Sequence, residues 1–176
     1  MRIYFMRHGQ TNYNVLGLCN DNPARDVFLT DTGRQQAHDA AHQLAQARIE
    51  HIFVSELART RQTADIINRH HCAPVSTHPA LNDWRTGLDG EPVSALYAAI
   101  AADPLNTRIN NGETLLEHKQ RVLTFIRWLR KRKEQTVLVV AHEETMRVAN
   151  AWFHGLDDDA MLTHHFANTH ILEFSA

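Results

Sequence analysis

The segment Thr136–Ala141 reads Thr-Val-Leu-Val-Val-Ala, an almost unbroken apolar run rich in β-branched residues. Such a run is typical of a strand buried on both faces, and strands of this kind occur in parallel sheets that are covered by helices. The shorter runs Ile3–Met6 and Ile52–Val54 have the same character. Helical segments separate these runs along the chain. The sequence therefore predicts an α/β fold, a three-layer sandwich with a mostly parallel central sheet and helices on both faces.

The boundaries of the elements follow from turn and capping residues. We expect strands at Arg2–Met6, Ile52–Val54, Pro74–Thr77, Thr136–Ala141 and Ile171–Phe174. We expect helices at Asp31–Arg48, Leu57–His70, Pro92–Ala102, from Gly112-Glu113-Thr114 to about Lys133, and at Glu143–Phe153. The segments Asn12–Phe28 and Leu81–Pro92 are interpreted as loops because they are polar and contain Gly and Pro. The 176 residues show no repeat or linker, so we expect residues 1–176 to form a single domain.

Composition excludes several classes of function. A net charge of −2 argues against a nucleic-acid partner that is bound through a basic surface. The apolar stretch Ala95–Ala102 is too short to span a membrane, and Cys19 and Cys72 lack the spacing of a metal or redox site. Charged residues interrupt the start of the chain, so no signal peptide is expected and the predicted location is cytoplasmic. The thirteen histidines include no His-Glu-x-x-His pattern, and we expect neither a metal nor a cofactor. The oligomeric state is left open.

Chemically capable side chains follow three of the expected strands. Arg7 and His8 follow the first strand, Ser55 and then Arg59 follow the second, and His142 follows Thr136–Ala141. The carboxyl ends of parallel strands meet at one edge of a sheet, where ligands bind in open α/β folds. Two imidazoles and two guanidiniums at one edge suit a tetrahedral dianion such as a phosphate group.

Several motifs resemble those of the histidine phosphatase superfamily, which includes the phosphoglycerate mutases. In chain order they are Arg7-His8-Gly9-Gln10-Thr11 with Asn14, Leu29–Ala37, Ser55–Ala64, Leu81-Asn82-Asp83, Gly112-Glu113-Thr114, Val139–His142 and Asn168-Thr169-His170. The resemblance spans nearly the whole chain. It implies that His8 attacks phosphorus and forms a phosphohistidine, which splits one difficult step into two. It further implies that Arg7, Arg59 and His142 bind the phosphate oxygens, that Asn14 donates to the same group, and that no metal is required.

Asp83 is the candidate general acid for the leaving oxygen. The superfamily more often has Glu at this place, and Asp is one methylene shorter. Asp89, Glu91 and Glu113 are rival acids. The pair Glu143-Glu144 stands where small residues are usual: it either caps the following helix or brings negative charge to the edge of the sheet.

The function that we expect is hydrolysis of a small phosphorylated metabolite, a phosphomonoester, with His8, Asp83 and His142 as catalytic residues. A second hypothesis is a mutase that returns the phosphoryl group to another hydroxyl. Hydrolysis is favoured because Arg85 and Arg108 are the only basic residues between Leu81 and Gly112. A third hypothesis is a phosphatase of phosphohistidine or phosphoprotein, and a fourth is an inactive phosphate-sensing domain. Small-molecule substrates are favoured by the cover that Leu81–Pro92 and the next helix provide.

Overall fold

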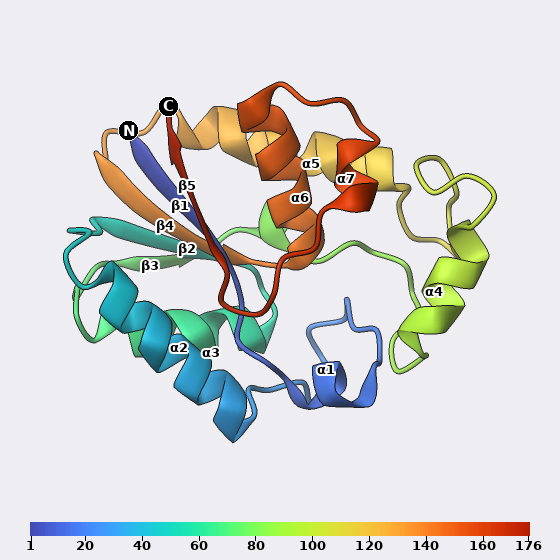
Figure 1. The fold of residues 1–176 in the computed structure, drawn as a ribbon, viewed down its shortest axis with the longest axis horizontal. Coiled ribbons are helices and arrows are strands. Elements are labelled where there is room, and N and C mark those ends of the chain that lie inside the picture. Colours follow the sequence, from blue (N-terminus) through green and yellow to red (C-terminus); the bar gives the residue numbers. More distant parts are fainter.

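The computed structural model describes residues 1–176 as five strands and seven α-helices (Figure 1). The strands are β1 (Arg2–Arg7), β2 (His51–Val54), β3 (Val75–Thr77), β4 (Thr136–Ala141) and β5 (Ile171–Ser175). The helices are α1 (Asn12–Leu16), α2 (Asp31–Leu44), α3 (Ala58–Asn68), α4 (Val93–Ile100), α5 (Leu115–Leu129), α6 (Glu143–His154) and α7 (Ala160–Thr163), with a 3₁₀ turn, η1, at Pro79–Leu81. None of these helices combines the length and apolar character that crossing a bilayer requires.

The strands form one sheet in the order β3-β2-β4-β1-β5. The pairs β2–β3, β2–β4 and β1–β4 are parallel, and only β5 runs antiparallel, beside β1. Strand β4 lies in the middle of the sheet, and its residues from Val137 to Ala141 are completely buried. The apolar run from which the fold was predicted is therefore the central strand, and the prediction of a mostly parallel sheet is confirmed.

Two apolar cores flank the sheet, one on each face. Ile3 and Phe5 of β1 belong to the core beneath α5 and α6, whereas Tyr4 and Met6 belong to the core beneath α2 and α3. Successive side chains of a strand point to opposite faces, so one strand supplies both cores. Figure 1 shows α2 and α3 on one side of the sheet and α5, α6 and α7 on the other. The expected three-layer sandwich is thus confirmed.

Local signals set several helix ends. The Thr30 side chain accepts a hydrogen bond from the Gly33 amide at the start of α2, and Thr114 forms a capping box with Glu117 at the start of α5. Helix α2 ends at Leu44 rather than at the expected Arg48. The chain turns there: Arg48 has a φ of 47°, and the next residue, Ile49, is buried.

Three short elements escaped prediction from the sequence. The segment Asn12–Phe28, expected to be a loop, begins with α1, which Thr11 and Asn14 cap reciprocally. Helix α1 is only five residues long, and its Val15 and Leu16 are exposed, so no amphipathic pattern marks it. Helix α7 and the turn η1 are similarly short. Short elements of this kind owe their stability to capping and tertiary contacts rather than to helix propensity.

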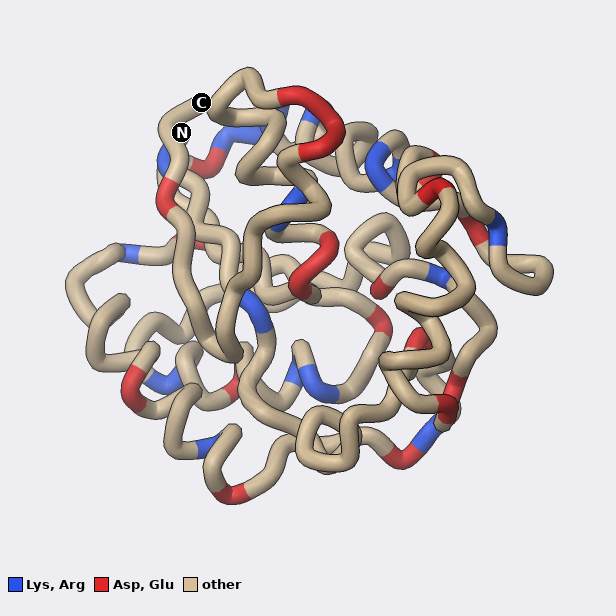
Figure 2. The backbone as a smooth tube through the Cα atoms, turned by 45° about the vertical axis from the view of Figure 1, so that its right-hand side comes forward, with Lys and Arg blue, Asp and Glu red and all other residues tan.

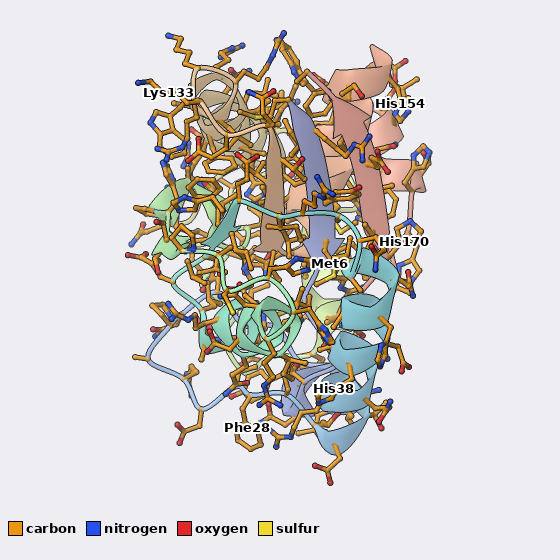
Figure 3. The ribbon with its side chains drawn as sticks, turned by 90° about the vertical axis from the view of Figure 1, so that its left-hand side faces the viewer. Met6, Phe28, His38, Lys133, His154 and His170 are labelled. Atoms are coloured by element: carbon orange, nitrogen blue, oxygen red, sulfur yellow. The ribbon has the colours of Figure 1, made fainter.

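The carboxyl ends of the parallel strands face a pair of loops that are tied together. Figure 3 places Lys133 and His154 near one end of the molecule and Phe28 near the other, with Met6 between them. The Asp89 carboxylate accepts hydrogen bonds from the Asn20 side chain at 2.8 Å and from the Asp21 amide at 2.9 Å. Basic and acidic residues are otherwise interspersed along the chain, as Figure 2 shows.

The turn after β1 packs against the start of α2 with no room for a side chain. A Cβ atom on Gly33 would overlap the backbone of Gln10, and one on Gly9 would come within 2.5 Å of the Gly33 carbonyl oxygen. The backbone next to His8 can therefore approach α2 this closely only because Gly9 and Gly33 have no side chain.

We expect Gly33→Ala to lower the free energy of unfolding by about 1–3 kcal/mol, because the added methyl group must displace backbone atoms. Urea denaturation followed by circular dichroism measures the change. Thr32→Ala, at an exposed position in the same helix, is the matched control and should stay within about 0.5 kcal/mol of the parent protein. Equal stability of the two variants would contradict the close packing.

Candidate active site

Parallel pairing brings the three predicted strand ends together. Arg7 lies opposite Ala141 in the β1–β4 register, so His8 and His142 are the next residues on neighbouring strands. The His8 amide donates to the Ala141 carbonyl at 3.1 Å, and the two imidazole rings lie 5.4 Å apart between centroids. Ser55 follows β2 on the other side of β4. The juxtaposition expected from the sequence is therefore present.

The protonation state of His8 follows from its two neighbours. Its Nδ1 lies 2.8 Å from the Gly9 carbonyl oxygen, which can only accept, so Nδ1 carries the proton. Its Nε2 accepts a hydrogen bond from Arg59 Nε at 3.1 Å. Burial, followed by the charge of Arg59 and by His142, lowers the pKa of His8 well below its usual value. The ring is therefore neutral, and its lone pair is on Nε2.

The guanidinium of Arg59 lies at the centre of the site. Arg59 is in the first turn of α3, and only 4% of its surface is exposed. Its Nη1 donates to Asn20 Oδ1 at 2.6 Å, and its Nη2 donates to Asp83 Oδ2 at 2.8 Å. Nη2 also lies 3.0 Å from the Asn20 carbonyl oxygen and 3.2 Å from His142 Nδ1. One buried cation thus joins both histidines to the two loops.

His142 is the N-cap residue of α6 and is almost completely buried. Because Arg59 Nη2 donates toward its Nδ1, the proton lies on Nε2, which donates to Ser55 Oγ at 2.9 Å. Burial and then Arg59 lower the pKa of His142 well below its usual value. Its ring does not line the cavity wall but contacts the guanidinium that does.

Asp83 lies at the cavity beside Arg59. Its Oδ1 accepts from the Trp84 amide at 2.8 Å, and its Oδ2 lies 3.4 Å from His142 Nδ1 in addition to its pairing with Arg59. Arg121 of α5 holds the loop from behind by donating to the carbonyl oxygens of Asn82 at 2.9 Å and Asp83 at 3.1 Å. Arg121 was not predicted from the sequence, since an arginine on a long helix carries no signal of the loop that it will support.

Arg7 is paired with a carboxylate inside the site. Its Nη1 donates to Glu143 Oε2 at 2.7 Å and to the Phe166 carbonyl oxygen at 2.6 Å. The other oxygen of Glu143 accepts from Arg147 and His165, both at 2.7 Å. Burial alone would raise the pKa of Glu143, but Arg7 and Arg147 lower it. Glu143 and Glu144 lie in the first turn of α6 and also line the cavity, so the structure is consistent with both interpretations of the pair.

Asn14 reaches the same cavity from α1. Its Oδ1 accepts from the Thr11 amide at 3.0 Å and from the Asn168 side chain at 3.3 Å, and Asn168 donates to the His8 carbonyl oxygen at 3.0 Å. The side-chain nitrogen of Asn14, Nδ2, donates to no acceptor within the chain. Asn14 therefore has a free donor at the cavity, and Asn168 links its position to that of His8.

The rival acids lie outside the cavity. Glu113 is buried and paired with Arg121 and His118. Asp89 ties the two loops together through Asn20 and Asp21, and Glu91 is exposed at the end of its loop. None of the three lines the cavity, whereas Asp83 does.

The cavity between the strand ends and the loops has a volume of about 160 Å³. Its charged lining residues are Arg7, Arg59, Asp21, Asp83, Glu143 and Glu144. An apolar cavity of about 250 Å³ adjoins it and shares Trp84, Leu96, Tyr97 and Glu144 with it. Asn20, which no motif indicated, connects the cavity wall to Arg59. No group of three or more His, Cys, Asp or Glu side chains is arranged to hold a metal ion.

Comparison with known proteins agrees with this geometry. The model of the histidine phosphatase superfamily (branch 1) matches residues 3–176. A probable phosphoglycerate mutase GpmB of Erwinia tasmaniensis is 31% identical to this chain. The alignment covers 69% of this chain and 60% of the relative, so the chain spans less than two thirds of that relative's length. The adenosylcobalamin/alpha-ribazole phosphatase of Salmonella typhimurium is 32% identical, and the alignment covers 81% of this chain and 74% of that protein.

A solved structure extends the likeness to the fold. The crystal structure of the alpha-ribazole phosphatase from Shigella flexneri superposes with a TM-score of 0.88 at 26% identity. The superposition covers 98% of this chain and 89% of that one.

We expect His8 and His142 to remain neutral at pH values where an ordinary histidine, with a pKa of about 6.5, is protonated. Their folded-state pKa values lie below those of the unfolded chain, so the stability that they contribute is lost as the pH falls below about 6.5. Ring-nitrogen NMR spectra recorded from pH 7.5 to 5 measure this, with His8→Ala and His142→Ala assigning the signals. A midpoint at or above 6.5 for either ring would contradict the burial argument.

Proposed function

Because the chain belongs to the histidine phosphatase superfamily, we propose that it hydrolyses a small phosphorylated metabolite, a phosphomonoester, through a phosphohistidine on His8. The observation that carries the proposal is the Nε2 lone pair of His8. The ring is held neutral, with its other nitrogen bound to the Gly9 carbonyl oxygen, and its lone pair lies beside a buried guanidinium. This arrangement is that of an activated nucleophile next to an anion-binding group.

In the proposed first step His8 Nε2 attacks phosphorus while the bond to the leaving oxygen breaks. Arg7, Arg59 and Asn14 are the proposed donors to the phosphate oxygens, on which charge spreads in a loose transition state. His142 joins them when its Nδ1, which accepts from Arg59 in the empty site, takes up a proton. To bind phosphate, Arg59 exchanges its contacts with His8, His142 and Asp83 for contacts with the anion. Water then attacks the phosphohistidine and releases phosphate.

Asp83 is the proposed catalytic carboxyl on the side of the leaving oxygen. It lines the cavity next to Arg59, and the rival carboxylates Glu113, Asp89 and Glu91 do not. Its loop is held by Arg121, which supports a defined position for the shorter side chain. Proton donation by a positioned carboxyl contributes about 10²–10⁴-fold to a rate.

The charge of the cavity supports hydrolysis rather than mutase-type transfer. A mutase has to retain a second phosphate group, yet the charged lining comprises four carboxyl groups and two guanidiniums, and one guanidinium is already paired with Glu143. Arg85, the basic residue of the covering loop, pairs with Glu113 instead of lining the cavity. The same acidic wall disfavours substrates with a second anionic group.

The adjoining apolar cavity supports an ester whose alcohol carries an apolar or ring-shaped group. Trp84, Leu96 and Tyr97 line both cavities, so an alcohol that leaves from the phosphate site would contact them. Relatives named alpha-ribazole phosphatases make such an ester the first substrate to assay. The cavity volume of about 160 Å³ supports a small molecule rather than a phosphohistidine-bearing protein. The proposed location is the cytoplasm, in keeping with the two unpaired thiols.

We expect His8→Ala to abolish phosphate release from every active compound in a panel of small phosphomonoesters, with EDTA present. Malachite-green detection of phosphate measures the rate. His38→Ala, a histidine on the outer helix α2, is the matched control and should retain the parent activity. Turnover that persists in the His8 variant would refute the phosphohistidine route.

We expect Asp83→Asn to slow the hydrolysis of alkyl phosphates by about 10²-fold and of aryl phosphates by less than about 10-fold, because only the alkoxide leaving group needs a proton. The ratio of kcat values for the two ester classes reports the effect. Equal losses on both classes would remove Asp83 from the acid role.

A further inference from the structure

Glu144 is a carboxyl group of the cavity without any partner. It is the second residue of α6 and lines both the phosphate cavity and the adjoining apolar cavity. Its neighbour Glu143 accepts from Arg7, Arg147 and His165, whereas Glu144 makes no hydrogen bond or ion pair within the chain. A partly buried carboxyl that accepts no hydrogen bond and forms no ion pair is costly to ionise.

The surrounding charges act in both directions. Asp83 and Glu143 repel a charge on Glu144, whereas Arg147 and Arg7 attract it, although both guanidiniums form their ion pairs with Glu143. Burial, followed by repulsion from Asp83, raises the pKa of Glu144 to about 7.

Neither Arg59 nor Arg147, which lines the adjoining cavity, forms an ion pair with Glu144. Arg59 is paired with Asp83. Burial and the nearby Asp83 and Glu144 raise the pKa of the Cys19 thiol to about 11, so the thiol is neutral. Tyr97 of α4 completes this part of the lining.

Asp83 has the opposite environment. Both of its oxygens accept hydrogen bonds, one from the Trp84 amide and one from the charged Arg59. The cavity thus holds one carboxyl group that accepts two hydrogen bonds and one that accepts none, and both line the same wall.

We propose that Asp83 and Glu144 act together as one acid, in which Glu144 holds the proton that the leaving-group oxygen receives. The inference rests on the proposed phosphomonoester hydrolysis and adds a residue to it. A phosphate group that enters the cavity draws Arg59 away from Asp83. Asp83 then loses its paired cation, while Glu144 still holds its proton.

Bonds and protons balance over the two halves of the reaction. His8 Nε2 forms its bond to phosphorus, the bond between phosphorus and the alcohol oxygen breaks, and that oxygen takes the proton of the pair, which becomes doubly ionised. In the second half, a water molecule returns a proton to the pair as its oxygen bonds to phosphorus. The bond from phosphorus to Nε2 breaks, and the lone pair of His8 is restored.

The test compares two esters in the full-length protein: 2-phenylethyl phosphate, whose alkoxide needs a proton, and 4-nitrophenyl phosphate, whose phenolate does not. We expect Glu144→Gln to lower kcat for the first ester by about 10²-fold and for the second by less than about 3-fold. For the parent we expect turnover of 2-phenylethyl phosphate to fall above a pH of about 7, and this fall should be absent in Glu144→Gln. Glu91→Gln, an exposed carboxyl outside the cavity, is the matched control and should behave as the parent.

The pH dependence of stability is a second readout, and it tests whether Glu144 holds a proton without any measurement of turnover. The pKa of Glu144 is higher in the folded chain than its ordinary value of 4.5, so proton binding favours the folded state. The stability of the parent should therefore fall between about pH 4.5 and pH 7 by an amount that Glu144→Gln does not show. The difference in Tm between variant and parent is expected to grow over that range and to level off above it. Asp83→Asn should move this effect to lower pH, because an amide does not repel the Glu144 carboxylate.

The outcomes separate the two proposals. Parent-like turnover of 2-phenylethyl phosphate by Glu144→Gln, with the loss above pH 7 unchanged, would overturn the role of Glu144 and leave Asp83 as the sole acid. Hydrolysis of 4-nitrophenyl phosphate through His8, with no turnover of 2-phenylethyl phosphate by the parent, would also overturn it. If His8→Ala still hydrolyses 4-nitrophenyl phosphate, the proposed function itself fails. A Tm difference that does not vary with pH would place the proton elsewhere.

Discussion

The buried guanidinium of Arg59 connects parts of the chain that are distant in sequence. Its donors reach His8 after β1, His142 after β4, Asn20 in the loop after α1 and Asp83 in the loop after η1. A cation removed from water needs compensating acceptors, and the loops supply them. The covering loops therefore take their places around this residue, and the same donors are available to an anion that enters the cavity.

Neutral imidazoles and a buried cation depend on one another. Protonation of either ring would place a second positive charge against Arg59, and burial lowers the pKa of both rings further. The Gly9 carbonyl oxygen selects the His8 tautomer, and the tight contact between Gly9 and Gly33 defines where that carbonyl lies. The state of the proposed nucleophile is thus decided by backbone packing as much as by side-chain chemistry.

Carboxyl groups outnumber guanidiniums in the lining of this cavity. Glu143 is held in its ionised form by Arg7 and Arg147, and Glu144 has no such partner, although the two residues are adjacent in the helix. The orientation of each side chain on α6 decides which one meets the arginines. Under the proposed function, phosphate would compete with Glu143 for Arg7, and this competition would favour an ester with little additional negative charge.

The sequence by itself determined the layer architecture and the identity of the strand-end residues. The β-branched run of β4 requires burial on both faces, and parallel strands must place His8, Arg59 and His142 at one edge. It did not determine the short helix α1, the antiparallel direction of β5 or the end of α2 at Leu44, which depend on caps and long-range pairing. Nor did it reveal Asn20 and Arg121, because their roles exist only where distant loops meet. The different states of Glu143 and Glu144 were decided by tertiary structure alone, since a carboxyl's charge depends on the cations within its reach.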